Sequence, residues 1–156
     1  MRAKFPKMLI IIINLRNGAL CCVDSVAACG GVPLKMDEWE IDILYTGSQK
    51  VLSAPPGTAP ISFSPRARDV IAKRATPVQS FYLDATVLGR YWNVDGQPRF
   101  YHHTGAVSNL FALREALAEY CAAPLDQSWR RHAEAAKLLH AGLADMGLEL
   151  YVPNQV

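Results

Sequence analysis

The sequence predicts an α/β fold in which a mostly parallel sheet is flanked by helices. Three observations favour this class: short apolar runs end at polar or glycine residues, amphipathic segments with helical spacing also occur, and the two kinds of segment alternate. The chain has 156 residues, of which 51% are hydrophobic and 19% charged, so it suits one globular domain and not a disordered segment. Its net charge of +2 comes with no basic block, and we expect no nucleic-acid partner.

The first segment, residues 1–16, begins with basic residues before an apolar run at 8–13, as a secretory signal peptide does. Asn14 and Arg16 interrupt the run, which is about a third of the length needed to cross a bilayer. We therefore expect neither a signal peptide nor a membrane span here, but a buried or irregular strand.

Three short segments are predicted to be strands. ALCCVD (19–24) and IDILYTG (41–47) are typical of buried parallel strands, and PISFS (60–64) is a weaker candidate. Near the end of the chain, LELYV (148–152) alternates apolar and polar residues and predicts a further strand.

Three helices are predicted from capping signals and apolar spacing. Ser64 and Pro65 form an N-cap and a first helical residue, which opens a helix to about Arg74. A second helix starts near Ser108, and a third covers about 126–146. We expect the third to pack through an apolar stripe that ends before Gly147; its members are Trp129, Ala133, Ala136, Leu139, Leu143 and Met146.

The cysteines and histidines do not predict a metal site. Cys21, Cys22, Cys29 and Cys121 lack the spacing of a zinc site or an evident disulfide framework, so we expect reduced thiols in an intracellular protein. The adjacent side chains of residues 102 and 103, both histidine, are expected to diverge, and no third ligand accompanies them.

Asp24 and Lys50 are the first functional candidates, because they lie at or just past the ends of two predicted strands. Ligands of α/β sheets bind beyond the carboxyl ends of the strands. Asp24 follows an apolar strand, so its carboxylate is expected to be desolvated and to need a cationic partner. One interpretation is a structural ion pair with Lys50. The other places a cofactor between them: an aldehyde such as pyridoxal phosphate, whose imine uses the lysine and whose ring nitrogen needs a carboxylate.

Longer motifs decide between these interpretations. The segment at 23–64, VDSVAACGGVPLKMDEWEIDILYTGSQKVLSAPPGTAPISFS, resembles the core of the alanine–glyoxylate and serine–pyruvate aminotransferases, which are class V members of fold type I. FYLD (81–84), DGQPRFYHHT (95–104) and LREAL (113–117) continue the similarity in order. The resemblance implies part of the large domain of a pyridoxal-phosphate-dependent transferase.

The resemblance also implies roles for individual residues. Lys50 matches the lysine that forms the internal aldimine and then moves the substrate proton, and Asp24 matches the partner of the pyridine nitrogen. Val26 matches a residue against one face of the ring, and Gln49 matches a phosphate contact. Taken alone, Val26 would be a core residue and Gln49 a hydrogen-bonded loop residue.

Tyr101 and Thr104 match residues that reach across a homodimer interface to the phosphate of the neighbouring subunit. Their hydroxyl groups suit an anion, although either could also be an ordinary surface or core group.

The expected function is transfer of an amino group from alanine or serine to a 2-oxo acid. Alternatives are a 3-hydroxykynurenine transaminase of the same family, another fold type I enzyme such as a desulfurase or lyase, or a catalytically incomplete fragment that holds no cofactor. We expect 17–152 to be a partial cofactor-binding large domain, with 1–16 unlike the family and the C-terminal small domain absent. Relatives are often peroxisomal or mitochondrial, so we expect an intracellular protein of the peroxisome, mitochondrion or cytoplasm.

Overall fold

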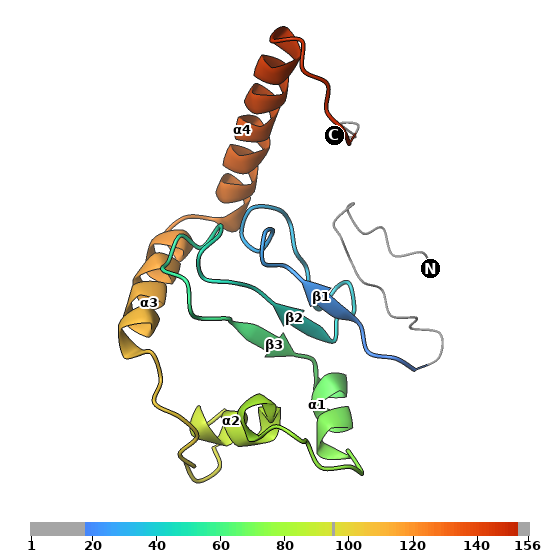
Figure 1. The fold of residues 1–156 in the computed structure, drawn as a ribbon, viewed down its shortest axis with the longest axis vertical. Helices are drawn as coiled ribbons and strands as arrows, with labels where there is room; N and C mark the ends of the chain where they lie inside the picture. The colour runs from blue at the N-terminus through green and yellow to red at the C-terminus, as the bar shows by residue number, and fades with distance from the viewer. Residues whose placement is uncertain (1–17, 95, 153–156) are drawn as a thin grey trace.

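The computed structural model describes residues 18–94 and 96–152 (Figure 1). Its sheet has the order β1-β2-β3, formed by β1 (Cys22–Asp24), β2 (Ile43–Tyr45) and β3 (Ile61–Phe63), with helices around it. The predicted α/β class is confirmed, and the three segments expected to be strands between residues 19 and 64 each contain one. Residues 1–16 lie outside the described part of the chain, so their predicted conformation stays a prediction.

The register of the sheet places the ends of neighbouring strands together. β1 pairs with β2 in parallel, with Asp24 opposite Tyr45, and β2 pairs with β3 antiparallel, with Tyr45 opposite Ile61. The antiparallel pairing follows from the turn at 55–57, where Gly57 has φ of 117° and the chain reverses toward the sheet. The carboxyl end of β2 therefore meets the amino end of β3.

The helices α1 (Pro65–Ala72) and α2 (Ala85–Tyr91) lie at one end of the sheet, with the short 3₁₀ helix η2 (Phe81–Leu83) between them (Figure 1). Ser64 caps α1 as predicted, because its hydroxyl accepts a hydrogen bond from the Ala67 N–H at 3.0 Å. The sequence reading missed η2 and α2. Asp84 marks the start of α2, where its carboxylate accepts from the Thr86 N–H at 2.8 Å.

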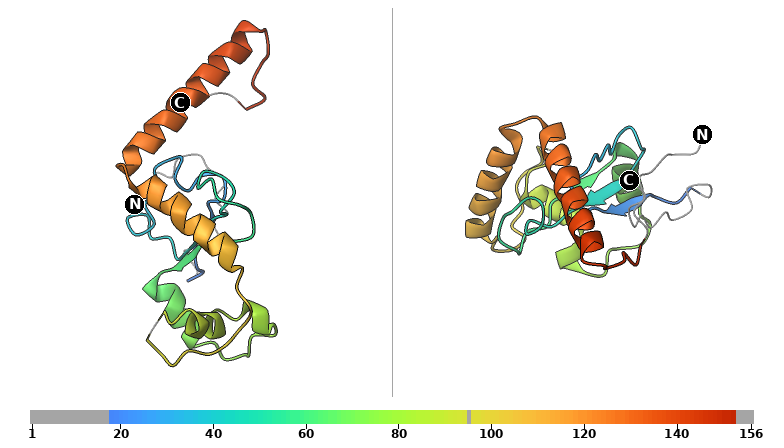
Figure 2. Two further views of the ribbon diagram at one scale, coloured as in Figure 1. Left: turned by 90° about the vertical axis from the view of Figure 1, so that its left-hand side faces the viewer. Right: turned by 90° about the horizontal axis from the view of Figure 1, so that it is seen from above.

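The helices α3 (Val107–Cys121) and α4 (Leu125–Asp145) begin within one residue of their predicted starts. Gly147 follows α4 with φ of 75°, which agrees with its expected role as a helix stop. Figures 1 and 2 show α4 extending away from the body that contains the sheet.

The expected packing of α4 through its apolar stripe is wrong for most of the helix. Leu139 is 61% exposed and Met146 is 68% exposed, whereas Ser128 in the first turn is buried. Only the amino-terminal turns of α4 lie against the body, so no described element covers the outer part of the stripe. The strand expected at 148–152 is also not formed, because no described strand lies beside it and Tyr151 is fully exposed.

The buried core consists of two small clusters. The first joins Cys21, Val23 and Ile41 beside the parallel strands, and the second joins Leu52, Ala54 and Leu113 between the loop after β2 and α3. All four cysteines are free thiols, as expected. Burial raises the pKa of the Cys21 and Cys29 thiols, whereas Cys121 is exposed. Across the described ranges, no helix is long and apolar enough to cross a membrane.

Candidate functional site

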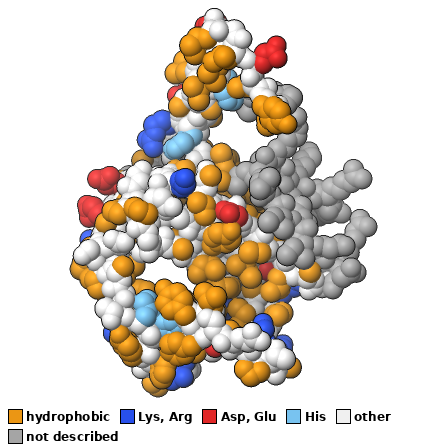
Figure 3. Space-filling view, viewed as in Figure 1, with side chains coloured by type: hydrophobic (Ala, Val, Ile, Leu, Met, Phe, Trp, Pro, Cys, Tyr) orange, Lys and Arg blue, Asp and Glu red, His pale blue; other side chains and the backbone are white. Residues whose placement is uncertain are grey.

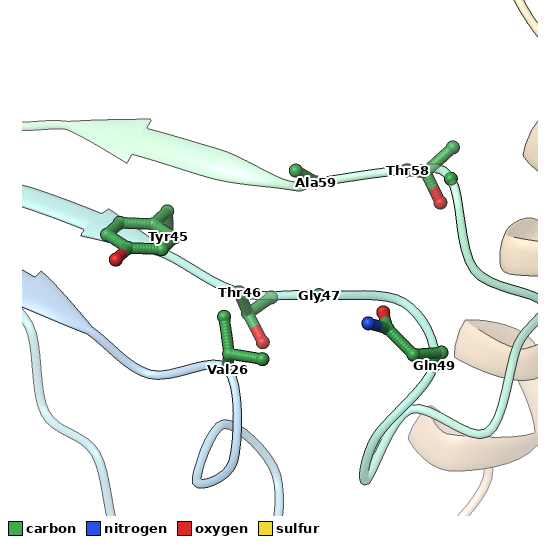
Figure 4. Close-up of a pocket in the computed structure, with 8 residues that line it drawn as sticks. Val26, Tyr45, Thr46, Gly47, Gln49, Thr58 and Ala59 are labelled. Atoms are coloured by element: carbon green, nitrogen blue, oxygen red, sulfur yellow. The ribbon is translucent and has the colours of Figure 1, made fainter.

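A hollow of about 300 Å³ lies where β2 ends and the chain approaches β3 (Figure 4). This is the edge of the sheet at which ligands of α/β proteins bind. The lining comes from the turn after β1, the segment leaving β2 and the segment entering β3: Val26, Tyr45, Thr46, Gly47, Gln49, Gly57, Thr58 and Ala59.

Asp24 lies beside this hollow and is held by two of its neighbours. The Val26 N–H donates to Asp24 Oδ1 at 2.9 Å, and the Tyr45 hydroxyl donates to Asp24 Oδ2 at 2.8 Å. Asp24 is exposed, so the expected desolvation of its carboxylate is wrong. The hydrogen bond to Asp24 raises the pKa of Tyr45, with smaller contributions from burial and from nearby negative charge.

Lys50 projects from the turn after Gln49 and is exposed. It forms no ion pair with any described residue, so the structural ion pair with Asp24 is not present. Its backbone is held on both sides, because the buried Ser48 hydroxyl donates to the Pro55 carbonyl at 2.6 Å and Leu52 is buried against α3. The turn therefore holds the backbone of Lys50, while its side chain is exposed and forms no ion pair with a described residue.

Gln49 and Val26 face each other across Gly47 (Figure 4). A Cβ on Gly47 would lie 2.8 Å from Gln49 Oε1 and 3.3 Å from Val26 Cγ1. The missing side chain of Gly47 thus keeps this part of the hollow open. The structure brings the two residues together as the resemblance implies, and their individual roles stay predictions.

One polar atom in the lining has no partner. Thr58 Oγ1 is buried and forms no hydrogen bond within the described part of the chain. Such atoms are uncommon in folded proteins and are found where a ligand or water completes the hydrogen bonding. A rotation of the Thr58 side chain would bring its hydroxyl toward the hollow, where it and the Gln49 amide would be neutral donors suited to an anionic group.

The residues around the hollow fit pyridoxal phosphate. The donors would suit its phosphate, Val26 and Ala59 provide apolar contact for a ring, and Asp24 and Lys50 supply the carboxylate and the amine. Among the described residues, no group of three or more His, Cys, Asp or Glu side chains could hold a metal ion.

Tyr101 and Thr104 lie away from this group. Their hydroxyls are hydrogen-bonded to each other at 2.9 Å, Tyr101 is 67% exposed, and neither residue lines the hollow of its own chain. They belong to the segment that follows α2, where hydrophobic side chains gather on the surface (Figure 3).

The two histidines between them do not diverge as expected. His102 Nδ1 and His103 Nδ1 are 2.7 Å apart, and His102 Nε2 is 3.0 Å from the Phe81 carbonyl oxygen. The rings of His102 and Phe81 are also stacked, with their centroids 4.6 Å apart. This contact buries His102 and explains the orientation of its ring.

Sequence reasoning missed several residues of the lining. Tyr45 is the last residue of β2, but the predicted strand continued to Gly47, so pairing the ends of the two predicted strands would have placed Gly47 beside Asp24 instead. Thr58 carries no sequence signal either, because its buried hydroxyl depends on the return of the chain to β3.

Comparison with protein families gives a match over residues 5–155 to the model described as aminotransferase class-V. The match starts inside the 1–16 segment. The alanine–glyoxylate aminotransferase of Callithrix jacchus is 54% identical over 139 residues, which are 89% of this chain and 34% of that protein. The Drosophila melanogaster protein of the same name is 46% identical over 154 residues, covering 94% of this chain and 39% of that protein.

Solved structures agree with these relatives. A crystal structure of alanine–glyoxylate aminotransferase from Nostoc sp. matches with a TM-score of 0.83 and 40% identity, over 89% of this chain and 36% of that one. The ureidoglycine–glyoxylate aminotransferase of Bacillus subtilis matches with a TM-score of 0.82 and 41% identity, over 89% and 35%. The chain thus spans about a third of the length of the proteins it matches.

Proposed function

The chain belongs to the class-V aminotransferases, and from this membership we propose that it is part of a transaminase that moves an amino group from alanine or serine to a 2-oxo acid. Class-V aminotransferases depend on pyridoxal phosphate. One observation carries the proposal: the Asp24 carboxylate is hydrogen-bonded to Val26 and Tyr45, which line the hollow at the carboxyl ends of the strands, and Lys50 directly follows a third lining residue, Gln49.

Different residues around the hollow would contact different parts of the cofactor. The cofactor, when bound, supplies a ring that accepts the electron pair left on the substrate α-carbon. Asp24 would hold a proton at the ring nitrogen, and Val26 would pack on one face of the ring. The Gln49 amide would donate to the phosphate without adding charge, and a turn of the Thr58 side chain would bring a second neutral donor to it.

Lys50 has two tasks in this proposal. A lysine amine is protonated at neutral pH and reacts poorly until a neighbouring group or a covalent bond removes the proton. Lys50 Nζ would anchor the cofactor at its aldehyde carbon. When substrate releases it, the same nitrogen would carry the proton away from the substrate α-carbon, and its exposed, unpaired position allows that movement.

The names of the relatives support glyoxylate as the amino acceptor. Both the alanine–glyoxylate and the ureidoglycine–glyoxylate enzymes carry glyoxylate in their names. Identity favours alanine as the donor, since alanine–glyoxylate relatives are 54% and 46% identical and the Bacillus subtilis (S)-ureidoglycine–glyoxylate transaminase is 39% identical.

We expect borohydride reduction of the chain with pyridoxal phosphate, followed by peptide mass mapping, to place a pyridoxyl group on Lys50. The covalent trap needs no turnover, so it applies even though the chain spans about a third of its relatives. Lys50→Ala should abolish the adduct and lower any transaminase rate by roughly 10³-fold or more, as expected for loss of a proton-transferring group.

Lys73→Ala is the matched control, because Lys73 is exposed just after the end of α1 and pairs only weakly with Asp69 at 3.8 Å. An adduct that persists in Lys50→Ala would overturn the role of Lys50, and no adduct on the wild-type chain would favour a fragment that holds no cofactor. A donor panel of alanine, serine, ureidoglycine and 3-hydroxykynurenine, each with glyoxylate, would then identify the substrate.

A second copy of the chain is the proposed partner. Tyr101 and Thr104 carry exposed hydroxyls on an apolar surface and do not line their own hollow, which supports a role at the hollow of a neighbouring subunit. We expect a Tyr101→Phe/Thr104→Ala variant and Lys50→Ala each to lose cofactor-dependent activity, and their mixture to regain about a quarter of it through hybrid dimers. A mixture as inactive as its components would contradict this arrangement.

A further inference from the structure

We propose that Tyr45 is a positioning residue for Asp24, whose phenol hydroxyl holds the carboxylate toward the ring nitrogen of the cofactor. This inference rests on the proposed function, because it concerns the same hollow. It adds a residue that the sequence motifs did not assign and gives it a role that acts through Asp24.

The parallel register brings the two side chains together. Asp24 and Tyr45 are opposite each other at the last position of β1 and β2, and the hydroxyl donates to Asp24 Oδ2 at 2.8 Å. The second oxygen, Oδ1, accepts from the Val26 N–H at 2.9 Å. A carboxylate has about four acceptor positions, so two donors fix its plane and leave roughly two positions for a ligand.

Both donors belong to residues that line the hollow. Tyr45 and Val26 approach it from neighbouring segments (Figure 4), and the carboxylate that they hold is therefore kept at its rim. A ring nitrogen bound there would meet an acceptor already oriented by the protein.

The environment of Asp24 makes this orientation depend on Tyr45. Asp24 is exposed and pairs with no Lys or Arg in the described ranges, so no cation fixes it. An exposed carboxylate without donors would sample several rotamers, and ordering it would weaken ligand binding. The phenol and one backbone N–H remove that cost before the ligand arrives.

The ionisation of Tyr45 agrees with this role. The hydrogen bond to Asp24 raises the pKa of Tyr45 above its ordinary value, as expected for a hydroxyl that donates to a carboxylate.

The first experiment is a double-mutant cycle in which the affinity for pyridoxal phosphate is measured by fluorescence titration. Tyr45→Phe should bind roughly 10-fold more weakly, in line with loss of a hydrogen bond to a charged group. In an Asp24→Asn background the same change should have no further effect, because there is no carboxylate left to orient. Tyr151→Phe is the matched control, since Tyr151 is fully exposed and does not line the hollow.

A second probe isolates the ring nitrogen. The 1-deaza analogue of pyridoxal phosphate has the same shape and phosphate but carbon in place of that nitrogen. We expect wild type and Tyr45→Phe to bind the analogue equally. A 10-fold loss that is the same for both ligands would show that Tyr45 supports the hollow only structurally, and would overturn the inference.

A third measurement does not need the cofactor. In an NMR titration of labelled tyrosine, Asp24→Asn should lower the pKa of Tyr45 toward its ordinary value; an unchanged pKa would show that the bond does not form in solution. Wild type that binds no pyridoxal phosphate would overturn the proposed function and this inference with it. Wild type that binds while Tyr45→Phe binds equally well would overturn the inference alone.

Discussion

Two aspartates lie at opposite ends of the paired strands β1 and β2, and the structure treats them differently. Asp42, just before β2, is 3% exposed and accepts from the Cys21 N–H at 2.8 Å, the Ser64 hydroxyl at 3.0 Å and Arg66 Nη1 at 3.0 Å. Asp24, at the end of β1, is exposed and has two neutral donors. The Asp42 carboxylate is buried and hydrogen-bonded within the fold, whereas the Asp24 carboxylate keeps exposed acceptor positions.

The same contrast extends to the neighbours of each aspartate. Arg66 also donates to the Gly18 and Ala19 carbonyl oxygens at 3.0 and 2.9 Å, so it ties the segment before β1 to the start of α1. At the other end, Thr58 Oγ1 has no described partner and Lys50 has no described ion pair. Polar groups with every partner inside the chain indicate stability, and an incomplete set indicates a place for a ligand.

Removing each carboxylate is the strongest test of this contrast. Asp42→Ala should lower the free energy of unfolding by about 3 kcal/mol, because a buried backbone N–H, a hydroxyl and half of an arginine fork lose their acceptor. Asp24→Ala should cost less than about 1 kcal/mol, since its oxygens are exposed to water. Urea unfolding followed by circular dichroism measures both.

If Asp42→Ala and Asp24→Ala lowered the free energy of unfolding equally, the contrast between the two carboxylates would be wrong. Arg66→Ala serves as the matched control on the stable side: the side chain is 47% exposed, so water can replace part of what it supplies, and its loss should fall between the two. Cofactor affinity should follow the opposite order, with Asp24→Ala the most affected variant.

The sequence predicted the elements that depend on local pattern. Ser64 and Pro65 indicated α1 because an N-cap acts over three residues, and short apolar runs indicated all three strands. Asp24 was found as a candidate for the same reason, since it closes such a run. Its environment was not predicted, because exposure depends on what covers the end of the sheet.

Long-range partners explain most of what the sequence reading missed. Asp42 accepts hydrogen bonds from residues 21 to 24 positions away, and Tyr45 reaches Asp24 across 21 positions, so no spacing rule identifies either pair. For α4 the prediction of packing was wrong because an expected contact is missing. Helical spacing correctly predicted the helix but could not show that no described element covers Leu139 and Met146.

A test with a smaller expected effect adds a methyl group at the hollow and changes no charged residue. In Gly47→Ala the new Cβ would lie 2.8 Å from Gln49 Oε1 and 3.3 Å from Val26 Cγ1. The Gln49 amide is the flexible end of a long side chain and can move aside, so unfolding free energy should change by less than about 1 kcal/mol. The same movement displaces a proposed phosphate donor and presses on the ring contact, so affinity for pyridoxal phosphate should fall roughly 10-fold by fluorescence titration.

Gly89→Ala is the matched control for this test. Gly89 lies within α2 with open space around it, so alanine should raise stability by about 0.5–1 kcal/mol through helix propensity and leave cofactor affinity unchanged. If Gly47→Ala instead destabilised the chain strongly while its affinity stayed constant, the carboxyl end of the sheet would be as much a part of the structural core as the Asp42 end. The expected result, lost affinity at nearly constant stability, requires that the hollow is kept open at little cost to the fold because Gly47 has no side chain.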